Sequence, residues 1–380
     1  MKQDEWISAE QACAQLGVRK QTLYAYASRK LLRVMQDPSE ARRSLYSARD
    51  VAHLAQSNRR PRARADVAAG SIRWGDPVLE TRISGVHNDT LYFGPARAID
   101  LAQSLTLEDV AARHMGVAVL EPPDADACAA ANGAFGTPMA RGLAALADMA
   151  AIAPASLGRG RDALAKDGAK VMAHLAYAMT GRTDGLVHSR LAKEWGLDQA
   201  GVDLIRMALV LLSDHELNPS TFAVRVCAST GGSLAACTLA GLATLSGPKH
   251  GGVAGKSLEA LRAGQAGTFD NFVTAQAGLR PYSYGFGHPL YPDGDPRAHA
   301  ILQALDAPIC RTVQDMSVFL GIPSNVDAAL SALTLHHDLP ADAALTIFAL
   351  GRVAGWIAHA IEQSQSDQII RPRARFTPAE

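Results

Sequence analysis

The chain has 380 residues, of which 48% are hydrophobic and 19% charged, and 37 basic residues balance 37 acidic ones. This length predicts two or three domains, and the composition excludes a disordered or fibrous protein. Asp4 and Glu5 stand where a secretory signal needs an apolar run, and the five cysteines contain no CxxC pair. We therefore expect a cytoplasmic protein with reduced thiols and no structural zinc site. The longest uncharged stretch, between Arg225 and Lys249, is rich in Gly, Ser and Thr and predicts a packed helix rather than a membrane span.

Charge is distributed unevenly along the chain. The first 64 residues carry 13 basic and six acidic side chains, a net charge of +7, which leaves −7 on the remainder. The boundary falls between Ser57 and Asp66, where Pro61 and clustered arginines are typical of an exposed linker. We expect a basic N-terminal domain over residues 1–56, a basic linker over 57–74, and an acidic body.

The N-terminal segment has the pattern of two short helices. Ser8 and Gln11 predict a capping box, and the apolar stripe that follows ends at Gly17. A second helix is predicted in the sequence RKQTLYAYASRK, with Leu23 and Ala27 facing inward.

A hairpin and a third helix are expected next. Residues 31–46 alternate in polarity around a turn at Asp37-Pro38, and Ser47 with Asp50 is typical of the cap of a helix. This order of elements resembles the winged helix-turn-helix of the MerR and excisionase families, over about 50 residues.

The basic face of the second helix predicts contact with DNA. Lysine and arginine release phosphate counterions, and a helix fits the major groove, where polar side chains can reach base edges. The alternative is a small helical domain used only for packing or dimerisation. The predicted DNA-binding residues are Arg19, Lys20, Gln21, Tyr24 and Arg29.

Beyond residue 71 the sequence predicts one small hairpin and then a mainly α protein. The hairpin is expected over residues 71–94, with turns at Gly-Asp-Pro and His-Asn-Asp. Periodic Ala- and Leu-rich segments predict helices over 98–114, 138–152, 159–179, 191–195, 201–212, 221–243, 258–263, 296–305, 312–320, 326–335 and 341–363.

Three polar motifs interrupt the helical background, and each contains a histidine. They are SDHELN at residues 213–218, GPKHGG at 247–252 and GFGHPLYPDGDPR at 285–297. A histidine at a helix end or on a Gly-rich loop can reach a cavity, and glycine neighbours let a substrate approach the backbone. Each histidine alone is more often a structural group than a catalyst, and Asp327 alone, at the start of a predicted helix, is more often an N-terminal cap or dipole partner. No ligand spacing supports a metal site.

These motifs, taken together and in order, resemble the citrate synthase family from about residue 75 to the C-terminus. The family patterns DHExN, GPxHGG, GFGHxxYxxxDPR, NVD, GRxxGWxAH and a terminal RPR recur here at residues 214–218, 247–252, 285–297, 325–327, 351–359 and 371–373. The resemblance implies an almost all-α homodimer. Each subunit would have a large domain (75–252 and 341–380) and a small domain (253–340) that closes over the substrate.

The resemblance also implies the reaction: acetyl-CoA condenses with oxaloacetate to give citrate and CoA, a step of the tricarboxylic acid cycle. The implied catalytic residues are His250, His288 and Asp327. Asp327 would remove a proton from the thioester methyl while His250 donates to the thioester carbonyl, and His288 would polarise the ketone. No permanently bound cofactor is implied, because acyl-CoA is a co-substrate.

The same resemblance places the oxoacid contacts. Guanidinium groups match carboxylates bidentately, and the implied positions are Arg297, Arg352 and Arg371, with His215 as a further contact. Arg371 would come from the partner subunit, so the site would require the dimer.

Three departures from the family pattern concern the CoA side. Most relatives have HRVYK after the loop histidine, whereas this chain has Pro289 and Pro292 at the basic positions. The GPxHGG loop continues as Val253-Ala254, where an Asn is usual, and residues 115–137 form a shorter segment than in relatives. Two alternatives therefore stay open: a 2-methylcitrate synthase, which differs by one methylene in its acyl group, and a metabolite-sensing DNA-binding regulator built on the same fold.

Overall fold

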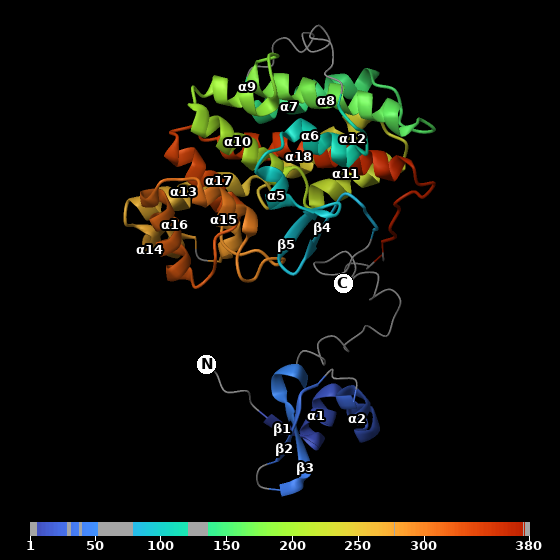
Figure 1. Ribbon diagram of the computed structural model, residues 1–380, viewed down its shortest axis with the longest axis vertical. Helices are drawn as coiled ribbons and strands as arrows, with labels where there is room; N and C mark the ends of the chain where they lie inside the picture. The colour runs from blue at the N-terminus through green and yellow to red at the C-terminus, as the bar shows by residue number, and fades with distance from the viewer. Residues whose placement is uncertain are drawn as a thin grey trace. The chain divides into compact units, whose positions relative to one another are not determined.

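The computed structural model describes residues 6–28, 32–37, 40–51, 79–120, 136–276, 278–374 and 376, without the side chains of Ala25 and of residues 40–43. The chain divides into two compact units, Met1–Glu80 and Thr81–Glu380 (Figure 1). The predicted linker at 57–74 lies outside the described residues.

The N-terminal unit contains two short helices and a three-stranded antiparallel sheet. The helices are α1 (Ala9–Leu16) and α2 (Lys20–Ser28), and the strands β1 (Trp6–Ser8), β2 (Val34–Asp37) and β3 (Glu40–Ser47) lie in the order β1-β3-β2. The short strand β1 was not predicted. It exists because it pairs with β3, in a register that sets Ser8 opposite Leu45.

The local signals predicted for this unit are present. The Gln11 amide donates to Ser8 Oγ at 3.2 Å, the Ser8 amide donates to the Gln11 side chain at 2.9 Å, and Gly17 ends α1 in a left-handed conformation. Residues 48–51 are helical, and the Asp50 amide donates to Ser47 Oγ at 3.4 Å. The buried core of the unit is Ile7, Ala12, Leu16, Leu23, Leu32, Tyr46 and Val51.

The C-terminal unit opens with the predicted hairpin. Strands β4 (Ser84–His87), β5 (Thr90–Phe93) and β6 (Ala96–Arg97) form an antiparallel sheet in chain order. Asn88 and Asp89 adopt φ values of 48° and 58°, the left-handed turn that asparagine and aspartate tolerate best.

Helices build the rest of the unit. They are α5 (Ala98–Ala102), α6 (Leu107–Met115), α7 (Pro138–Ile152), α8 (Arg161–Thr180), α9 (Val187–Glu194), α10 (Gln199–Leu212), α11 (Pro219–Ser229), α12 (Leu234–Leu245), α13 (Val253–Gln265), α14 (Phe269–Ala275), α15 (Pro296–Gln303), α16 (Ala307–Leu320), α17 (Val326–His336) and α18 (Ala343–Ser364), with a 3-10 turn η2 (Pro281–Tyr284). The predicted mainly α class is confirmed.

Local caps and glycines explain where the helices depart from the prediction. The segment expected as one helix over 98–114 breaks before Thr106, which caps α6. The segment expected over 221–243 breaks at Gly231, in a left-handed conformation, and Ser233 then caps α12. Helix α14 was not predicted.

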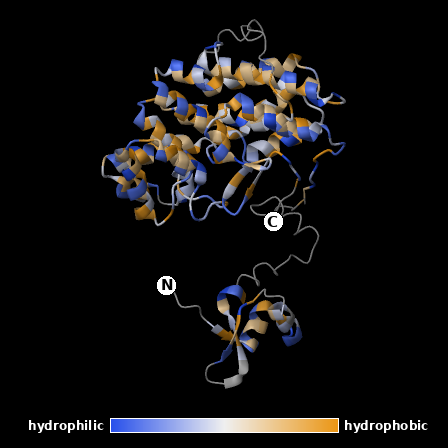
Figure 2. Cartoon of the chain, in the orientation of Figure 1, coloured by the Kyte–Doolittle hydropathy of each residue, from blue (hydrophilic) through white to orange (hydrophobic). Residues whose placement is uncertain are grey.

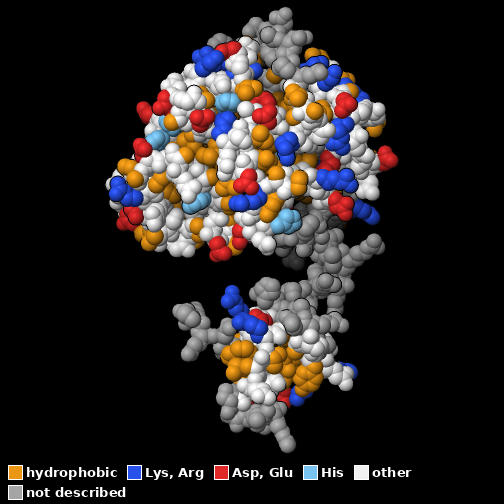
Figure 3. Space-filling view, in the orientation of Figure 1, with side chains coloured by type: hydrophobic (Ala, Val, Ile, Leu, Met, Phe, Trp, Pro, Cys, Tyr) orange, Lys and Arg blue, Asp and Glu red, His pale blue; other side chains and the backbone are white. Residues whose placement is uncertain are grey.

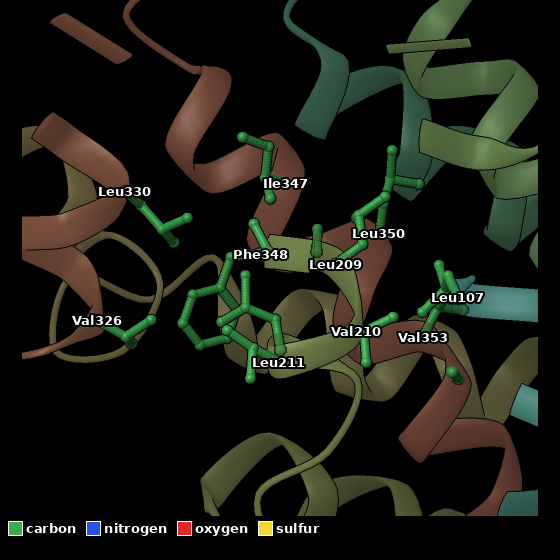
Figure 4. Packing of buried hydrophobic residues seen from close by; sticks show 14 of the residues in the cluster. Leu107, Leu209, Val210, Leu211, Val326, Leu330, Ile347, Phe348, Leu350 and Val353 are labelled. Atoms are coloured by element: carbon green, nitrogen blue, oxygen red, sulfur yellow. The ribbon is translucent and has the colours of Figure 1, made fainter. Parts of the chain in front are cut away.

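Helix α18 is the centre of the core. It packs against α6, α8, α10, α11 and α12, while α13, α15, α16 and α17 pack on one another. Figure 4 shows Ile347, Phe348, Leu350 and Val353 of α18 meeting Leu209–Leu211 of α10, with Val326 and Leu330 of α17 nearby. Helix α18 is long and apolar enough to cross a membrane, but 94% of its apolar window is buried inside the unit. It is therefore a core helix, and Figure 2 shows its mainly hydrophobic colouring.

Candidate active site

His215 lies in the SDHELN segment between α10 and α11, which buried polar contacts hold in place. The neighbouring Asp214 is fully buried and accepts hydrogen bonds from the Ser84 hydroxyl of β4 and from His359 Nε2 of α18, the latter at 3.2 Å. Glu216 adopts φ 45°, and its amide donates to Ser84 Oγ at 2.8 Å. These bonds tie the loop to the hairpin and to α18, so the buried His215 ring has a defined position.

His250 lies in the glycine-rich turn between α12 and α13. Its Nε2 lies 2.9 Å from Ser220 Oγ, and its ring meets Phe348 edge-on with centroids 6.0 Å apart. Burial lowers the pKa of His250 to about 4, and the nearby charge of Arg352 acts in the same direction. The imidazole is therefore neutral at physiological pH.

His288 lies on the loop between η2 and α15. The Leu290 amide donates to His288 Nδ1 at 3.2 Å. Burial lowers the pKa of His288 to about 4, Arg297 contributes to this lowering and Asp295 opposes it. A neutral imidazole that accepts at Nδ1 carries its proton on Nε2, which makes Nε2 a hydrogen-bond donor.

Hydrogen bonds join the His288 loop to the segment that leads into α17. The Gly287 amide donates to the Pro323 carbonyl at 2.7 Å, and Asn325 bonds the carbonyls of Gly285 and Gly287 through its amide and side chain at 2.9 and 3.0 Å. Gly285 has φ 101°, and a Cβ there would meet Ser257 Oγ at 2.6 Å. Only glycine fits this crossing, which brings His288 and Asp327 into one structural piece.

Asp327 is the second residue of α17. Its amide donates to the Asn325 cap at 2.9 Å, and its side chain is 7% exposed. Asp327 Oδ1 is buried with no hydrogen-bond partner among the described residues. Burial raises the pKa of Asp327 to about 7, with Arg297 and Arg352 opposing the rise and Asp295 adding to it. A carboxyl group with this pKa exchanges a proton at neutral pH.

Arg297 is buried and paired within its own motif. Its Nε and Nη2 donate to the two Asp295 oxygens at 3.0 and 2.8 Å, and Asp295 also accepts from the Val326 amide at 3.1 Å. Burial alone would lower the pKa of Arg297, but Asp295 raises it above its ordinary value. The bidentate edge of Arg297 is therefore occupied by Asp295, which leaves Nη1 for a ligand.

Arg352 differs from Arg297 because no carboxylate in the described part of the chain pairs with it. It is 1% exposed on α18, its Nε donates to the Leu212 carbonyl at 2.8 Å, and its guanidinium lies 5.0 Å from the Phe348 ring centroid. Its Nη2 is buried without a hydrogen-bond partner among the residues described. Burial lowers the pKa of Arg352 to about 10, so the group is still charged at neutral pH. A buried cation with an unused donor has a strong preference for an anion.

The structure brings six of the seven predicted site residues of this unit together. Arg297, His288, Arg352 and His250 all lie close enough to His215 to lower its pKa, and its ring meets the His288 ring edge-on with centroids 5.2 Å apart. Arg297 and Arg352 likewise lie close enough to Asp327 to lower its pKa against the effect of burial. Arg371 lies exposed in the C-terminal segment, where the adjacent Ile370 amide donates to Ser229 Oγ at 3.1 Å.

The predicted DNA-binding residues lie in the other unit. Arg19, Lys20, Gln21 and Tyr24 are exposed, and Lys20 pairs with Glu10 at 3.4 Å. Arg29 lies outside the described residues.

Four residues that position the site were not among the predicted site residues. These are Ser220 beside His250, Trp356, whose indole donates to Ser220 Oγ at 3.2 Å, Asp295 beside Arg297, and Tyr291, whose hydroxyl lies 2.8 Å from His215 Nε2. The Asp-Pro-Arg spacing was a usable signal for Asp295. Tyr291 and Trp356 are fixed letters of the motifs at 285–297 and 351–359, although no role was predicted for them. Ser220 had no signal in the sequence.

Comparison with known families gives one match that covers most of the chain. The citrate synthase C-terminal domain matches residues 112–373. Citrate synthase 2 of Bacillus subtilis is 33% identical over 191 residues, covering 46% of this chain and 51% of that protein. The 2-methylcitrate synthase of Shewanella oneidensis is 27% identical over 230 residues, covering 55% and 56%. The chain thus spans about half the length of the curated relatives it matches.

Solved structures show the same fold. The ternary complex of citrate synthase from Thermoplasma acidophilum with carboxymethyl coenzyme A and oxaloacetate has a TM-score of 0.64 at 23% identity, covering 80% of this chain and 95% of that one. Citrate synthase from Pyrobaculum aerophilum has a TM-score of 0.61 at 25% identity, covering 80% and 91%.

Proposed function

Because this chain belongs to the citrate synthase family, we propose that it condenses acetyl-CoA with oxaloacetate to give citrate and CoA. The observation that carries this proposal is Asp327, a buried carboxyl group with an unpartnered oxygen and a pKa of about 7, beside two buried arginines. Such a group is a general base suited to neutral pH. Acyl-CoA is a co-substrate, and no permanently bound cofactor is part of the proposal.

The first step is removal of a proton from the thioester methyl by Asp327. This carbon acid is weak, so the developing enolate oxygen needs a hydrogen-bond donor. His250 takes this role through Nδ1–H, which requires its Nε2 to accept the proton of the Ser220 hydroxyl. Ser220 Oγ also lies 2.7 Å from Asn218 Oδ1, so the role requires the hydroxyl to turn from Asn218 to His250.

The second step joins the enolate carbon to the ketone carbon of oxaloacetate. His288 binds the ketone oxygen through Nε2–H and donates that proton as the alkoxide forms. Water then cleaves the citryl thioester and releases CoA as a free thiol. Closure of the small domain, residues 253–340, over the large domain excludes solvent during both steps.

The oxaloacetate carboxylates are held by cations. Arg352 supplies its unused Nη2, Arg297 its remaining edge, and His215 a further contact. Arg371 is contributed by the partner subunit of a homodimer, which accounts for its exposure in the single chain. The active site is therefore complete only in the dimer.

The acyl group is the least determined part of the proposal. A 2-methylcitrate synthase is among the relatives, and one methylene is worth only about 1–3 kcal/mol of discrimination. Pro289 and Pro292 occupy the positions where relatives carry basic residues near CoA. Turnover of acetyl-CoA and propionyl-CoA by the same sample decides the acyl group, and a clear propionyl preference would replace our substrate assignment.

For the N-terminal unit we propose a winged helix-turn-helix that binds DNA. Helix α2 presents the exposed Lys20, Gln21 and Tyr24, the exposed Arg19 directly precedes it, and the β2–β3 hairpin takes the place of the wing. The Lys20 ion pair with Glu10 is exposed and weak, so phosphate can displace it. A cytoplasmic location fits both activities.

The decisive experiment is a thiol-release assay on the full chain and on Asp327→Ala, with oxaloacetate and either acyl-CoA. We expect release of CoA by the wild type and a loss of at least a thousandfold in the variant. Equal rates would remove Asp327 as the base. DNA binding that depends on oxaloacetate, together with no thiol release, would instead favour the regulator.

A further inference from the structure

Tyr291 lies at the meeting point of three proposed oxoacid-binding groups. Its side chain is fully buried, its hydroxyl lies 2.8 Å from His215 Nε2, and its ring centroid is 4.9 Å from that of His288. The Arg297 guanidinium carbon lies 5.5 Å from the same ring. The Tyr291 amide donates to the His288 carbonyl at 3.0 Å, so a tight turn sets the direction of the ring.

The protonation states of Tyr291 and His215 determine which proton can lie in the hydrogen bond between them. Burial raises the pKa of Tyr291, and burial together with Arg297 and His288 lowers the pKa of His215 well below its usual range. At neutral pH, therefore, a neutral phenol faces a neutral imidazole. Each carries one proton, and only one of the two protons can lie between Oη and Nε2.

The surroundings decide which proton lies there. If His215 Nε2–H donated to the phenol oxygen, the phenol hydrogen would need a second acceptor in a buried place. Among the described residues, the structure gives the Tyr291 hydroxyl one hydrogen-bond partner, His215 Nε2. Leaving a buried hydroxyl hydrogen unpaired is costly, whereas a phenol that donates to Nε2 pairs the hydroxyl hydrogen with that nitrogen and leaves Nδ1–H to donate to a ligand.

We propose that Tyr291 is a positioning residue that donates to His215 Nε2, holds His215 as its Nδ1–H tautomer, and so presents a donor to an oxygen of the 2-oxoacid. This inference rests on the proposed function for the identity of the ligand. The tautomer itself rests only on the contacts around Tyr291.

The ring and the hydroxyl of Tyr291 have separable tasks. The ring covers one face of Arg297, whose other contacts run to Asp295. Tyr291→Phe keeps this ring and removes only the hydroxyl. Tyr291→Leu removes both and serves as the broader perturbation.

The kinetic test measures KM for each substrate and kcat in Tyr291→Phe. We expect KM for oxaloacetate to rise about tenfold or more, as is usual when a buried donor is lost, with KM for acetyl-CoA unchanged. Tyr177→Phe, on α8, is the matched control and leaves all three parameters at their wild-type values. A Tyr291→Phe enzyme with wild-type KM for oxaloacetate would overturn the proposal.

The tautomer is measured directly by NMR of the ring nitrogens in protein labelled with nitrogen-15 histidine, with His215 assigned by its absence in His215→Gln. We expect protonated Nδ1 in the wild type and a shift toward protonated Nε2 in Tyr291→Phe. A wild-type His215 protonated at Nε2 would overturn the proposal, whether or not any variant folds. Because this signal needs no turnover, it also separates a failure of the proposal from a failure of the condensation assignment.

Discussion

The two units offer ligands two different kinds of surface. In the N-terminal unit the described proposed binding residues are exposed on α2 and just before it, and the ion pair between Lys20 and Glu10 is open to solvent. In the C-terminal unit the proposed binding residues are buried and held by named partners, as Asp295 holds Arg297. An exposed basic face attracts phosphates without fixed geometry, whereas a buried site must be built before the ligand arrives. On the face shown in Figure 3, basic and acidic side chains are interspersed over the C-terminal unit. The two arginines proposed to bind the oxoacid, Arg297 and Arg352, are buried.

The largest expected effect concerns Asp327. Asp327→Asn keeps the shape of the side chain and removes the base, so we expect kcat for thiol release to fall by at least about a thousandfold. In the wild type, kcat/KM should rise with pH and level off above about 7, because the carboxyl must lose its proton to act. His250 and His288, whose pKa values are near 4, contribute no titration in this range. A flat profile between pH 6 and 8 would exclude Asp327 as the titrating base.

Arg352 tests whether a buried unpaired cation exists to bind the oxoacid. Arg352→Met should raise KM for oxaloacetate about a hundredfold, since a buried charge-assisted pair is lost. Arg352→Lys keeps the charge without the planar fork and should give an intermediate value. Because no carboxylate pairs with Arg352 among the described residues, we expect the Met variant to unfold at the same or a higher temperature. A variant that is unstable but has normal KM would make Arg352 structural.

Ionised Asp327 should also lower the free energy of unfolding, and the size of this effect should depend on pH. Its pKa is about 7 in the folded state against an ordinary value of 3.8, so the folded protein holds this proton more tightly than the unfolded chain. Stability is therefore lost as pH rises from about 4 to about 7. Asp327→Asn should raise the free energy of unfolding by about 4 kcal/mol at pH 8 and by less than about 1 kcal/mol at pH 4. Urea titrations at both pH values measure the difference, and equal values would contradict the burial argument.

Ser220 tests the proton arrangement at His250. Ser220→Ala removes the hydroxyl that must donate to His250 Nε2, so the tautomer able to donate from Nδ1 loses its support. We expect kcat to fall about ten- to a hundredfold with KM for oxaloacetate unchanged. Ser220→Thr, which retains a hydroxyl, should recover part of the rate. A change in KM for oxaloacetate with kcat unchanged would mean that Ser220 acts in oxoacid binding and not through His250 in the proton-transfer step.

The smallest expected effect lies on the exposed face of the N-terminal unit. Changing Arg19 and Lys20 together to Gln should weaken DNA binding about tenfold and lower the salt dependence by about two ions. Lys170 and Lys193, two exposed lysines of the C-terminal unit, changed together to Gln give the same charge loss as a control. An equal loss of binding in both pairs would mean that net charge, and not α2, governs the interaction.

The sequence predicted elements best where the signal is local. Helix α7 was predicted at its observed bounds because Thr137 caps it, Pro138 follows, and an Ala-rich run continues to Ile152. Strand β1 and helix α14 were missed because each is short: β1 is held by pairing with β3, and Phe269 of α14 packs against Phe286 and Phe319. The breaks at Thr106 and Gly231 show that a cap or a left-handed glycine can divide an otherwise periodic segment.

Prediction of the site depended on recognising motifs rather than on periodicity. His215, His250, His288 and Asp327 come from separate segments, and no spacing rule brings them together before the chain folds. Tyr291 stands in a quoted motif, but its contact with His215, like that of Ser220 with His250, could not be predicted because each joins residues at least 30 positions apart in the chain. Arg297 was expected as a free fork, yet its fork is filled by Asp295 two residues earlier.

The hydrogen bonds from Asn325 to the carbonyls of Gly285 and Gly287 have a mechanical consequence. They couple Asp327, the proposed base, to His288, the proposed proton donor to oxygen, so any movement of this segment carries both. His250 and Arg352 belong to different helical surroundings, on the α12–α13 turn and on α18. Opening and closing of the proposed small domain would therefore change the distances from Asp327 and His288 to His250 and Arg352. The distance between Asp327 and His288 would stay constant. A single movement of one domain against the other would then assemble or separate the four residues, and no independent movement of each residue would be needed.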